Sequence, residues 1–144
     1  MHDFSSLAKA ISDIDLESMF KINDDEVQQL LLEFPATYSY YAVLAAEATV
    51  LRNKAKFDLD MAEAEMNRTI REDAKARGEK ITEKGIDTAV KLSAAYRDAF
   101  DKFNKSEENM KVLSAIVSGL SRYGDTLMQA SKYQIAEMAK TVGG

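Results

Sequence analysis

The stretch ATYSYYAVLAAEATVLRNKAKFDLDMAEAEMNRTIREDAKAR, residues 36–77, decides the fold of this chain. It contains neither glycine nor proline, and residues that favour helices dominate it. Its apolar residues recur at steps of three and four, which matches the 3.6-residue helical period. They are Tyr41, Leu44, Ala48, Leu51, Ala55, Leu59, Ala62, Met66 and Ile70. The pattern predicts one helix of roughly 42 residues, about 60 Å long at 1.5 Å per residue.

Downstream, the sequence predicts a stop and a second long helix. Gly78 follows Lys75 and Arg77, a typical end of a helix. Thr82 then starts a short helix with Ile86 and Val90 on its inner side. Ser93 is expected to cap a second long helix, whose apolar residues are Tyr96, Phe100, Phe103, Met110, Leu113, Val117, Leu120 and Leu127. Gly119 and Gly124 interrupt this pattern and indicate a kink, close packing or a break.

Upstream, residues 1–12 are expected to be a short, weakly ordered lead-in, with a first turn or two after Ser12 or Asp13. Asn23 precedes Asp24, Asp25 and Glu26 and predicts the N-cap of a further helix, which carries Val27, Leu30, Leu31 and Phe34. Pro35 is expected to end that helix. Residues 141–144 are expected to fray. These boundaries divide the chain into an acidic N-terminal helical arm, residues 1–34, and a long helical hairpin, residues 35–144.

The predicted fold class is all-α: an elongated antiparallel hairpin of two long helices with a short N-terminal helical segment. No strand-like alternation occurs in the 144 residues. A compact chain of this length would be only about 35–40 Å across. A hairpin of about 60 Å exposes more of its apolar stripes. We therefore expect a homo-oligomer, ring-like in form, that assembles through helix packing.

Composition excludes most enzyme chemistry. The chain has no cysteine, one histidine (His2) and no glycine-rich phosphate loop, so thiol catalysis, Ser-His-Asp triads and P-loop hydrolysis are ruled out. Six carboxylates lack the Glu-x-x-His pairs of di-metal bundles and scatter around the first long helix: Asp58, Asp60, Glu63, Glu65, Glu72 and Asp73. We therefore expect no catalytic residue, no cofactor and no metal. With no apolar run that could cross a bilayer and no signal-like N-terminus, we expect no membrane partner and a cytoplasmic location.

The net charge of −5 is unevenly distributed. Residues 1–50 carry two basic and nine acidic side chains, whereas residues 51–91 carry ten basic and nine acidic ones. Residues 92–144 carry seven basic and six acidic ones. The acidity is therefore confined to the first third, which is a candidate docking arm for a basic partner or a mask for the basic region of a neighbouring subunit.

A basic cluster at the predicted hairpin tip is the candidate binding site. Arg68, Arg71 and Lys75 are spaced i, i+3 and i+7, on the face opposite the apolar stripe. Arg77, Lys80 and Lys84 continue the cluster across the tip. Repeated around an oligomer, such a patch would follow a phosphate backbone. The competing interpretation is that these cations only complement the helix dipole and keep the surface solvated, because four acids lie among them: Glu72, Asp73, Glu79 and Glu83.

Two groups of aromatic residues offer rings that could stack on unpaired bases. Tyr41, Tyr96, Phe100 and Phe103 lie on apolar stripes, and core packing is the favoured interpretation for them. Tyr38 and Tyr40 are less committed and are expected to pack against the acidic helix.

The layout resembles the UvsY-like recombination mediators of tailed phages. Residues 38–48 (YSYYAVLAAEA) open a long helix, 80–84 (KITEK) start a short one that runs from Ile86 to Val90, and Tyr96-x-x-Ala99 opens a second long helix. This helix continues through residues 111–113 (KVL) and from Leu120 to Leu127. The resemblance covers about residues 35–130 and leaves the acidic segment outside.

The resemblance implies a non-enzymatic protein of DNA recombination and repair. Members of that family bind single-stranded DNA, form ring-like homo-oligomers, and help a RecA-type recombinase to displace single-strand-binding protein. The positions that match its DNA-binding role are Arg68, Arg71, Lys75, Arg77, Lys80 and Lys84. The alternatives are a structural or assembly protein, such as a phage scaffold or helical adaptor, and an inhibitor of a host protein, neither of which would bind DNA.

Overall fold

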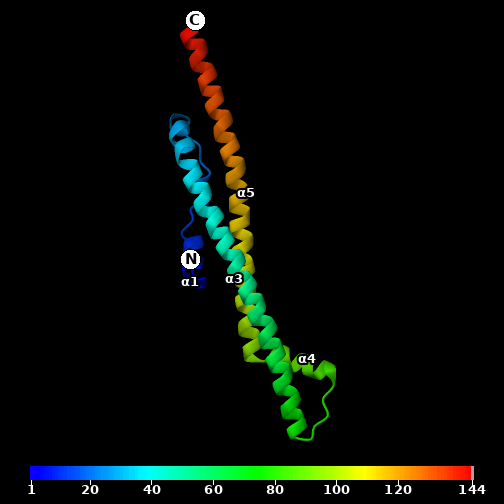
Figure 1. Ribbon diagram of the computed structural model, residues 1–144. Helices are drawn as coiled ribbons and strands as arrows, with labels where there is room; N and C mark the ends of the chain where they lie inside the picture. The colour runs from blue at the N-terminus through cyan, green and yellow to red at the C-terminus, as the bar shows by residue number, and fades with distance from the viewer. Residues whose placement is uncertain (144) are drawn as a thin grey trace. The chain divides into compact units, whose positions relative to one another are not determined.

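The computed structural model describes residues 1–143, and every regular element in this range is a helix (Figure 1). In chain order they are α1 (Phe4–Ser12), α2 (Leu16–Met19), the 3₁₀ turn η1 (Asp24–Glu26), α3 (Val27–Ala76), α4 (Glu83–Leu92) and α5 (Ala94–Gly143). The all-α class is confirmed, and the two long helices α3 and α5 pack together. None of the helices in residues 1–143 has the length and apolarity that a membrane span requires.

The chain forms two compact units, and both long helices contribute to each. The first unit contains residues 1–47 and the chain from residue 111 onward, and the second contains residues 48–110. Residues far apart in the sequence therefore build the first unit, whereas one continuous segment builds the second.

Large aliphatic side chains fill the core of the first unit. Six of them are almost inaccessible to solvent: Leu7, Val27, Leu44, Leu113, Leu120 and Leu127. The Gln28 side-chain amide donates a hydrogen bond to Ser131 Oγ (2.8 Å), and the Phe34 ring lies 6.4 Å from that of Tyr123. In this unit, residues later in α3 therefore contact residues earlier in α5.

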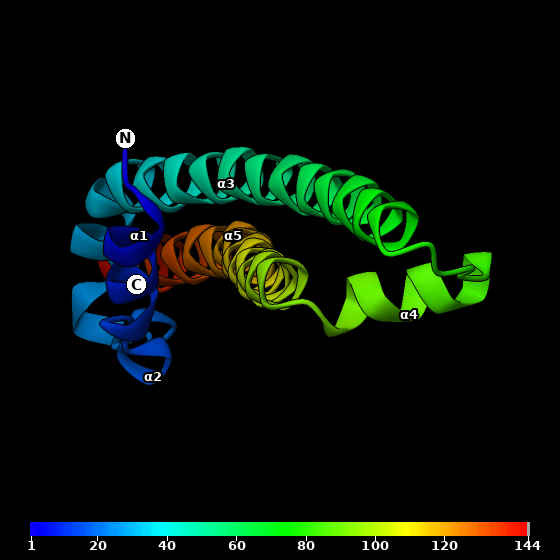
Figure 2. The ribbon, with the colours of Figure 1, turned by 90° about the horizontal axis from the view of Figure 1, so that it is seen from below.

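Alanine makes up half of the buried apolar core of the second unit, which consists of Ala48, Ala55, Leu59, Ala74, Ile86 and Val90. Arg52 of α3 pairs with Glu107 of α5 (3.4 Å) and lies 5.0 Å from the centre of the Phe103 ring. The ammonium group of Lys56 lies 5.7 Å from the same ring centre. Figure 2 shows α4 as a separate short helix between the end of α3 and the start of α5.

The predicted helix end at Pro35 is wrong, because α3 continues through this residue. A proline inside a helix removes one backbone hydrogen bond, here the bond to the Leu31 carbonyl. The residues around it are held by tertiary contacts, since Val27 and Leu44 are buried and Phe34 packs against Tyr123. Packing of both flanks therefore offsets the local cost.

The weakly ordered lead-in is also wrong, since residues 4–12 form helix α1. The Asp3 side chain accepts a hydrogen bond from the Ser6 backbone N–H (2.8 Å) and caps this helix, and Leu7 is buried beneath it. His2 Nδ1 lies 2.7 Å from Glu47 Oε2, which joins the start of the chain to α3. A short amphipathic helix is thus stabilised by a cap, by one buried anchor and by the hydrogen bond between His2 and Glu47 just before it.

The two glycines of the second long helix are sites of close packing, since α5 is continuous across them. A β-carbon at Gly119 would lie 3.1 Å from the Phe20 ring, and one at Gly124 would lie 2.5 Å from the Phe34 ring. The helix is assigned to Gly143, so the fraying expected for residues 141–143 is not seen, and residue 144 lies outside the described residues.

Candidate nucleic-acid interface

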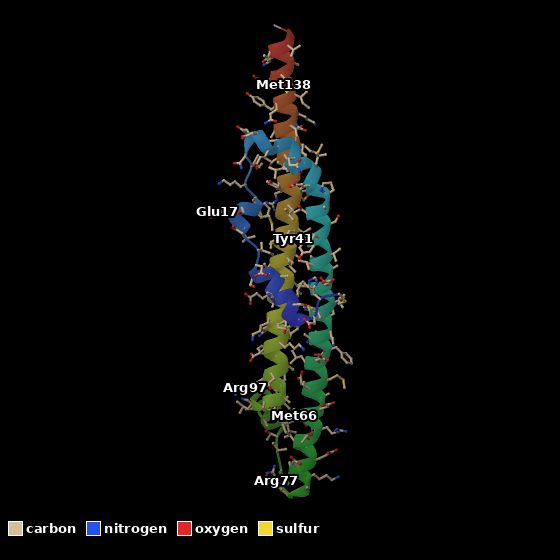
Figure 3. All side chains as sticks on the ribbon, turned by 90° about the vertical axis from the view of Figure 1, so that its left-hand side faces the viewer. Glu17, Tyr41, Met66, Arg77, Arg97 and Met138 are labelled. Carbon is tan, nitrogen blue, oxygen red and sulfur yellow. The ribbon has the colours of Figure 1, made fainter. Side chains whose placement is uncertain are left out.

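All six predicted basic residues belong to the second unit, around the turn that joins α3 to α4. Arg68, Arg71 and Lys75 lie on the last turns of α3, and all three are exposed. Arg77 and Lys80 lie in the connection, and Lys84 lies on the first turn of α4, again exposed. Figure 3 labels Arg77 at this turn.

Local sequence signals build the turn as expected. Gly78 has a φ of 67° and the Glu79 N–H donates to the Ala74 carbonyl (2.9 Å), which is the left-handed glycine termination of a helix. Thr82 Oγ1 then accepts from the Gly85 N–H (3.0 Å) and caps α4. The stop at Gly78 and the cap at Thr82 are both confirmed.

Three of the six basic residues line one shallow hollow of about 480 Å³. Its lining residues are Arg71, Ala74, Lys75, Glu79, Lys80, Ile81 and Ile86. The remaining three, Arg68, Arg77 and Lys84, are outside this lining and extend the basic surface without closing around it. The lining therefore combines three cationic side chains, one carboxylate and three apolar side chains.

Nearby acids engage two of the six cations. A terminal nitrogen of Arg71 lies 2.5 Å from Glu83 Oε2, and its Nε donates to Asn67 Oδ1 (2.8 Å). Arg77 Nε lies 3.9 Å from Glu79 Oε2. The hydrogen bond from Arg71 holds the pKa of the Glu83 carboxyl below its ordinary value of 4.5. Both partners are exposed, so the pair adds little stability and a competing anion can exchange for Glu83.

The other four cations, Arg68, Lys75, Lys80 and Lys84, make no ion pair within residues 1–143. Exposed cations that lack a protein partner are the groups that a phosphate backbone engages, since each contact releases a counterion. Over the same range of residues, no three histidine, aspartate or glutamate side chains converge to hold a metal ion.

The aromatic residues only partly follow the sequence expectation. Tyr41 is half-buried, and burial raises the pKa of its hydroxyl. Tyr96 and Phe100 stack with their ring centres 5.9 Å apart and an interplanar angle of 16°. Phe100 remains 41% exposed, so the prediction that it is a core residue is wrong. Tyr38 packs on Phe34, whereas Tyr40 is exposed and packs edge-on against Tyr41.

The first unit also contains an apolar groove that the sequence pattern does not predict. Its volume is about 420 Å³, and Leu16, Phe20, Val112, Ala115, Ile116 and Gly119 line it. Leu16 and Val112 are too far apart in the sequence for any periodic pattern to join them. The only available signal was Gly119, which admits the Phe20 ring against α5.

Comparison of the chain with protein-family models, with curated proteins and with solved structures gives no match.

Proposed function

We propose that this protein is a non-enzymatic recombination mediator that binds single-stranded DNA. The observation that carries the proposal is the basic surface of the second unit. Six exposed cations surround one helix turn, four of them make no ion pair within residues 1–143, and three line a common hollow. Electrostatic binding of this kind is independent of sequence and strongly dependent on salt, which suits a protein that must follow any single strand.

The finer parts of the proposal come from the family resemblance and from the sequence. In this more detailed proposal, α3 and α5 form an antiparallel hairpin, and the hairpins assemble into a ring-like homo-oligomer. Each copy contributes one weak basic patch, and the ring binds by avidity. The mediator then helps to load a RecA-type recombinase by displacing single-strand-binding protein, while the acidic N-terminal segment contacts one of these proteins.

A direct test is titration of a fluorescent oligothymidylate at about 50 and 200 mM salt. We expect binding at low salt that weakens steeply as salt rises. The charge-reversal variant Arg68→Glu/Arg71→Glu/Lys75→Glu should lose at least about tenfold in affinity, because three phosphate contacts become repulsions.

The matched control reverses three other exposed lysines of the second unit, Lys54, Lys102 and Lys105. Lys102 and Lys105 flank Phe103, which lies against Arg52 and Lys56 rather than against the turn. The control variant should retain most of the affinity. Absence of binding by the wild type at low salt, or equal losses in the two variants, contradicts the proposal.

The second candidate function is a structural or adaptor protein that does not bind DNA. The apolar groove and the exposed apolar residues of the first unit favour it, because they need a protein partner. In that case the chain assembles normally and no oligonucleotide binds at either salt concentration.

A further inference from the structure

One exposed face of α3 carries an aromatic ring and cations together. Phe57 lies between the buried residues Ala55 and Leu59, so its side chain points away from the core, and it is 64% exposed. From Phe57, steps of four and three continue along the same face of the helix, and every position they reach is exposed. The positions are Phe57, Met61, Ala64, Arg68, Arg71 and Lys75, which we call the α3 outer strip.

The outer strip contains no acidic residue. Arg68 and Lys75 make no ion pair within residues 1–143, whereas Arg71 is engaged by Glu83. At 100° per residue, the nearest acids of α3 lie roughly 60° or more around the helix from Phe57. These acids are Asp60, Glu65 and Glu72. The strip is therefore apolar at one end and cationic at the other, with acids only at its sides.

The strip is long enough to hold several nucleotides. Phe57 and Lys75 are separated by about five helical turns, so they lie on the same side of α3 about 27 Å apart. At the 3.4 Å spacing of one strand of a duplex, this length corresponds to at most about eight nucleotides, and an extended strand places fewer there. Lys54 lies one turn beyond Phe57 and roughly 60° to its side, outside the strip.

We infer that Phe57 is a stacking platform for an unpaired base of the strand whose phosphates bind Arg68 and Lys75. Proteins that bind single strands combine cations that follow the backbone with aromatic rings on which bases stack. The bases of a duplex are already stacked on one another, so an exposed ring selects a single strand. This inference rests on the single-strand binding of the proposed function and adds the residue that reads the bases.

A second copy of α3 is the competing occupant of the strip, and the charges argue against it. In a parallel pair of strips, the cations of one copy would face the cations of the other. In an antiparallel pair in register, Lys75 would face Phe57 of the second copy, and Arg71 would face Met61. Because the strip has no acidic residue, neither arrangement gives its cations a carboxylate from the facing strip. A nucleic-acid strand offers one phosphate per nucleotide.

The test is the affinity for a fluorescent oligothymidylate of about 12 nucleotides, longer than the strip, at about 50 mM salt. Phe57→Ala and Phe57→Leu should each lose about fivefold or more in affinity, because one base loses the ring on which it stacks. Phe57→Tyr keeps a ring and should retain most of the affinity. The matched control is Tyr133→Ala, which removes another exposed aromatic side chain (68% exposed) in the first unit and should bind like the wild type.

An abasic oligomer of the same length separates stacking from charge, because it has the phosphates without the bases. The wild type and the four variants should bind this oligomer alike. A fluorescent ring gives a second readout, since the chain contains no tryptophan. The emission of Phe57→Trp should be quenched by the oligothymidylate and not by the abasic oligomer, whereas Tyr133→Trp should respond to neither.

Several results would overturn the inference and leave the electrostatic binding of the proposed function intact. They are an unchanged affinity in Phe57→Ala, a retained affinity in Phe57→Leu, an equal loss on the abasic oligomer, and an unquenched Phe57→Trp that binds DNA. Sedimentation equilibrium compares the assembly of each variant, and a loss of assembly in Phe57→Ala would assign the ring to a contact between copies and also overturn the inference. Absence of binding by the wild type contradicts the proposed function and the inference together.

Discussion

The two units are stabilised in different ways. The first has a core of leucines and aromatic rings that interlock with two glycines, and it carries six basic and eleven acidic side chains. The second has a core rich in alanine, thirteen basic and thirteen acidic side chains, and cation–ring contacts at Phe103. Two of its buried polar atoms, Arg52 Nε and Ser106 Oγ, have no hydrogen-bond partner among the described residues. The first unit therefore has the core of larger side chains, whereas the second unit has equal numbers of basic and acidic side chains.

The largest expected effect is a cavity in the first unit. Leu120→Ala removes a fully buried side chain and should lower the free energy of unfolding by about 2–5 kcal/mol. Leu59→Ala in the second unit should lie near the bottom of that range, because smaller neighbours and a slightly open site lose fewer contacts. Urea denaturation measures both. Equal losses of unfolding free energy in the two variants would show that the two units do not differ in packing.

The next effect tests the glycine contact in α5. Gly124→Ala places a β-carbon 2.5 Å from the Phe34 ring, which Tyr38 and Tyr123 hold in place. The overlap costs roughly 1–3 kcal/mol and the gain in helix propensity returns up to about 1, so we expect a net loss near 1 kcal/mol. In a Phe34→Leu background the same change should stabilise the protein. Thermal denaturation of the wild type, the two single variants and the double variant measures these changes in stability. Stabilisation by Gly124→Ala in the wild-type background would contradict the close contact between Gly124 and the Phe34 ring.

Two alanine substitutions, one in each unit, compare a buried hydroxyl that has no hydrogen-bond partner with one that has a partner. Ser106→Ala removes a buried oxygen without a partner and should stabilise the chain by about 1 kcal/mol. Ser131→Ala breaks the hydrogen bond from Gln28 and should destabilise it by about 0.5–1.5 kcal/mol. Chemical denaturation gives both values, and the same sign for both variants would show that the partners do not differ.

A smaller effect tests whether an acid of the second unit competes with DNA for one of its basic residues. Glu83→Gln removes the carboxylate that pairs with Arg71, so a phosphate group no longer has to displace this carboxylate from the guanidinium. We expect the affinity for an oligothymidylate at low salt to rise by no more than about two- to fivefold, since an exposed ion pair is weak and is easily displaced. Glu108→Gln, another exposed acid of this unit, serves as the control. Equal gains in the two variants would point to net charge rather than to Arg71.

The smallest effect is the pH dependence of the contact between the chain start and α3. Burial raises the pKa of the Glu47 carboxyl, but the hydrogen bonds from His2 outweigh it, and the net pKa lies below the ordinary value of 4.5. A carboxyl with a depressed pKa stabilises the folded chain above its unfolded pKa, and this contribution is lost as the pH falls through the folded value.

We therefore expect α1 to loosen below about pH 4.5, by less than about 1 kcal/mol because the pair is partly exposed. Amide exchange at Leu7, followed from about pH 6 to pH 3, measures this, and in Glu47→Gln the change across that range should be smaller. An unchanged pH profile in the variant would assign the effect to other carboxyls, such as Asp3.

Much of the fold could be predicted from the sequence, because its main signals are local. The 3.6-residue stripe of α3, the stop at Gly78 and the cap at Thr82 each depend on neighbours within a few residues. The passage of α3 through Pro35 could not be predicted, since it depends on packing between α3 and α5. Helix α1 was missed for the same reason: the burial of its anchor Leu7 and the hydrogen bond of the preceding His2 with Glu47 are tertiary contacts.

The candidate site shows the same limit. Helical spacing placed Arg68, Arg71 and Lys75 on one exposed face of α3, and the structure agrees. Which cations share the hollow, and the engagement of Arg71 by Glu83, depend on how the chain turns between them. The apolar groove depends on two helices that are distant in the sequence and was beyond any periodic signal.

The division of the chain into a continuous unit and a discontinuous one has a consequence for folding kinetics. Long-range contacts of the first unit join residues 102–110 positions apart, as in the hydrogen bonds of Gln28, Tyr123 and Gln134. In the second unit the Arg52–Glu107 and Arg71–Glu83 pairs close loops of 55 and 12 residues. Shorter loops cost less entropy to close, so the second unit should form first. Its formation brings the segments of the first unit together and shortens the loop that the leucine core must close.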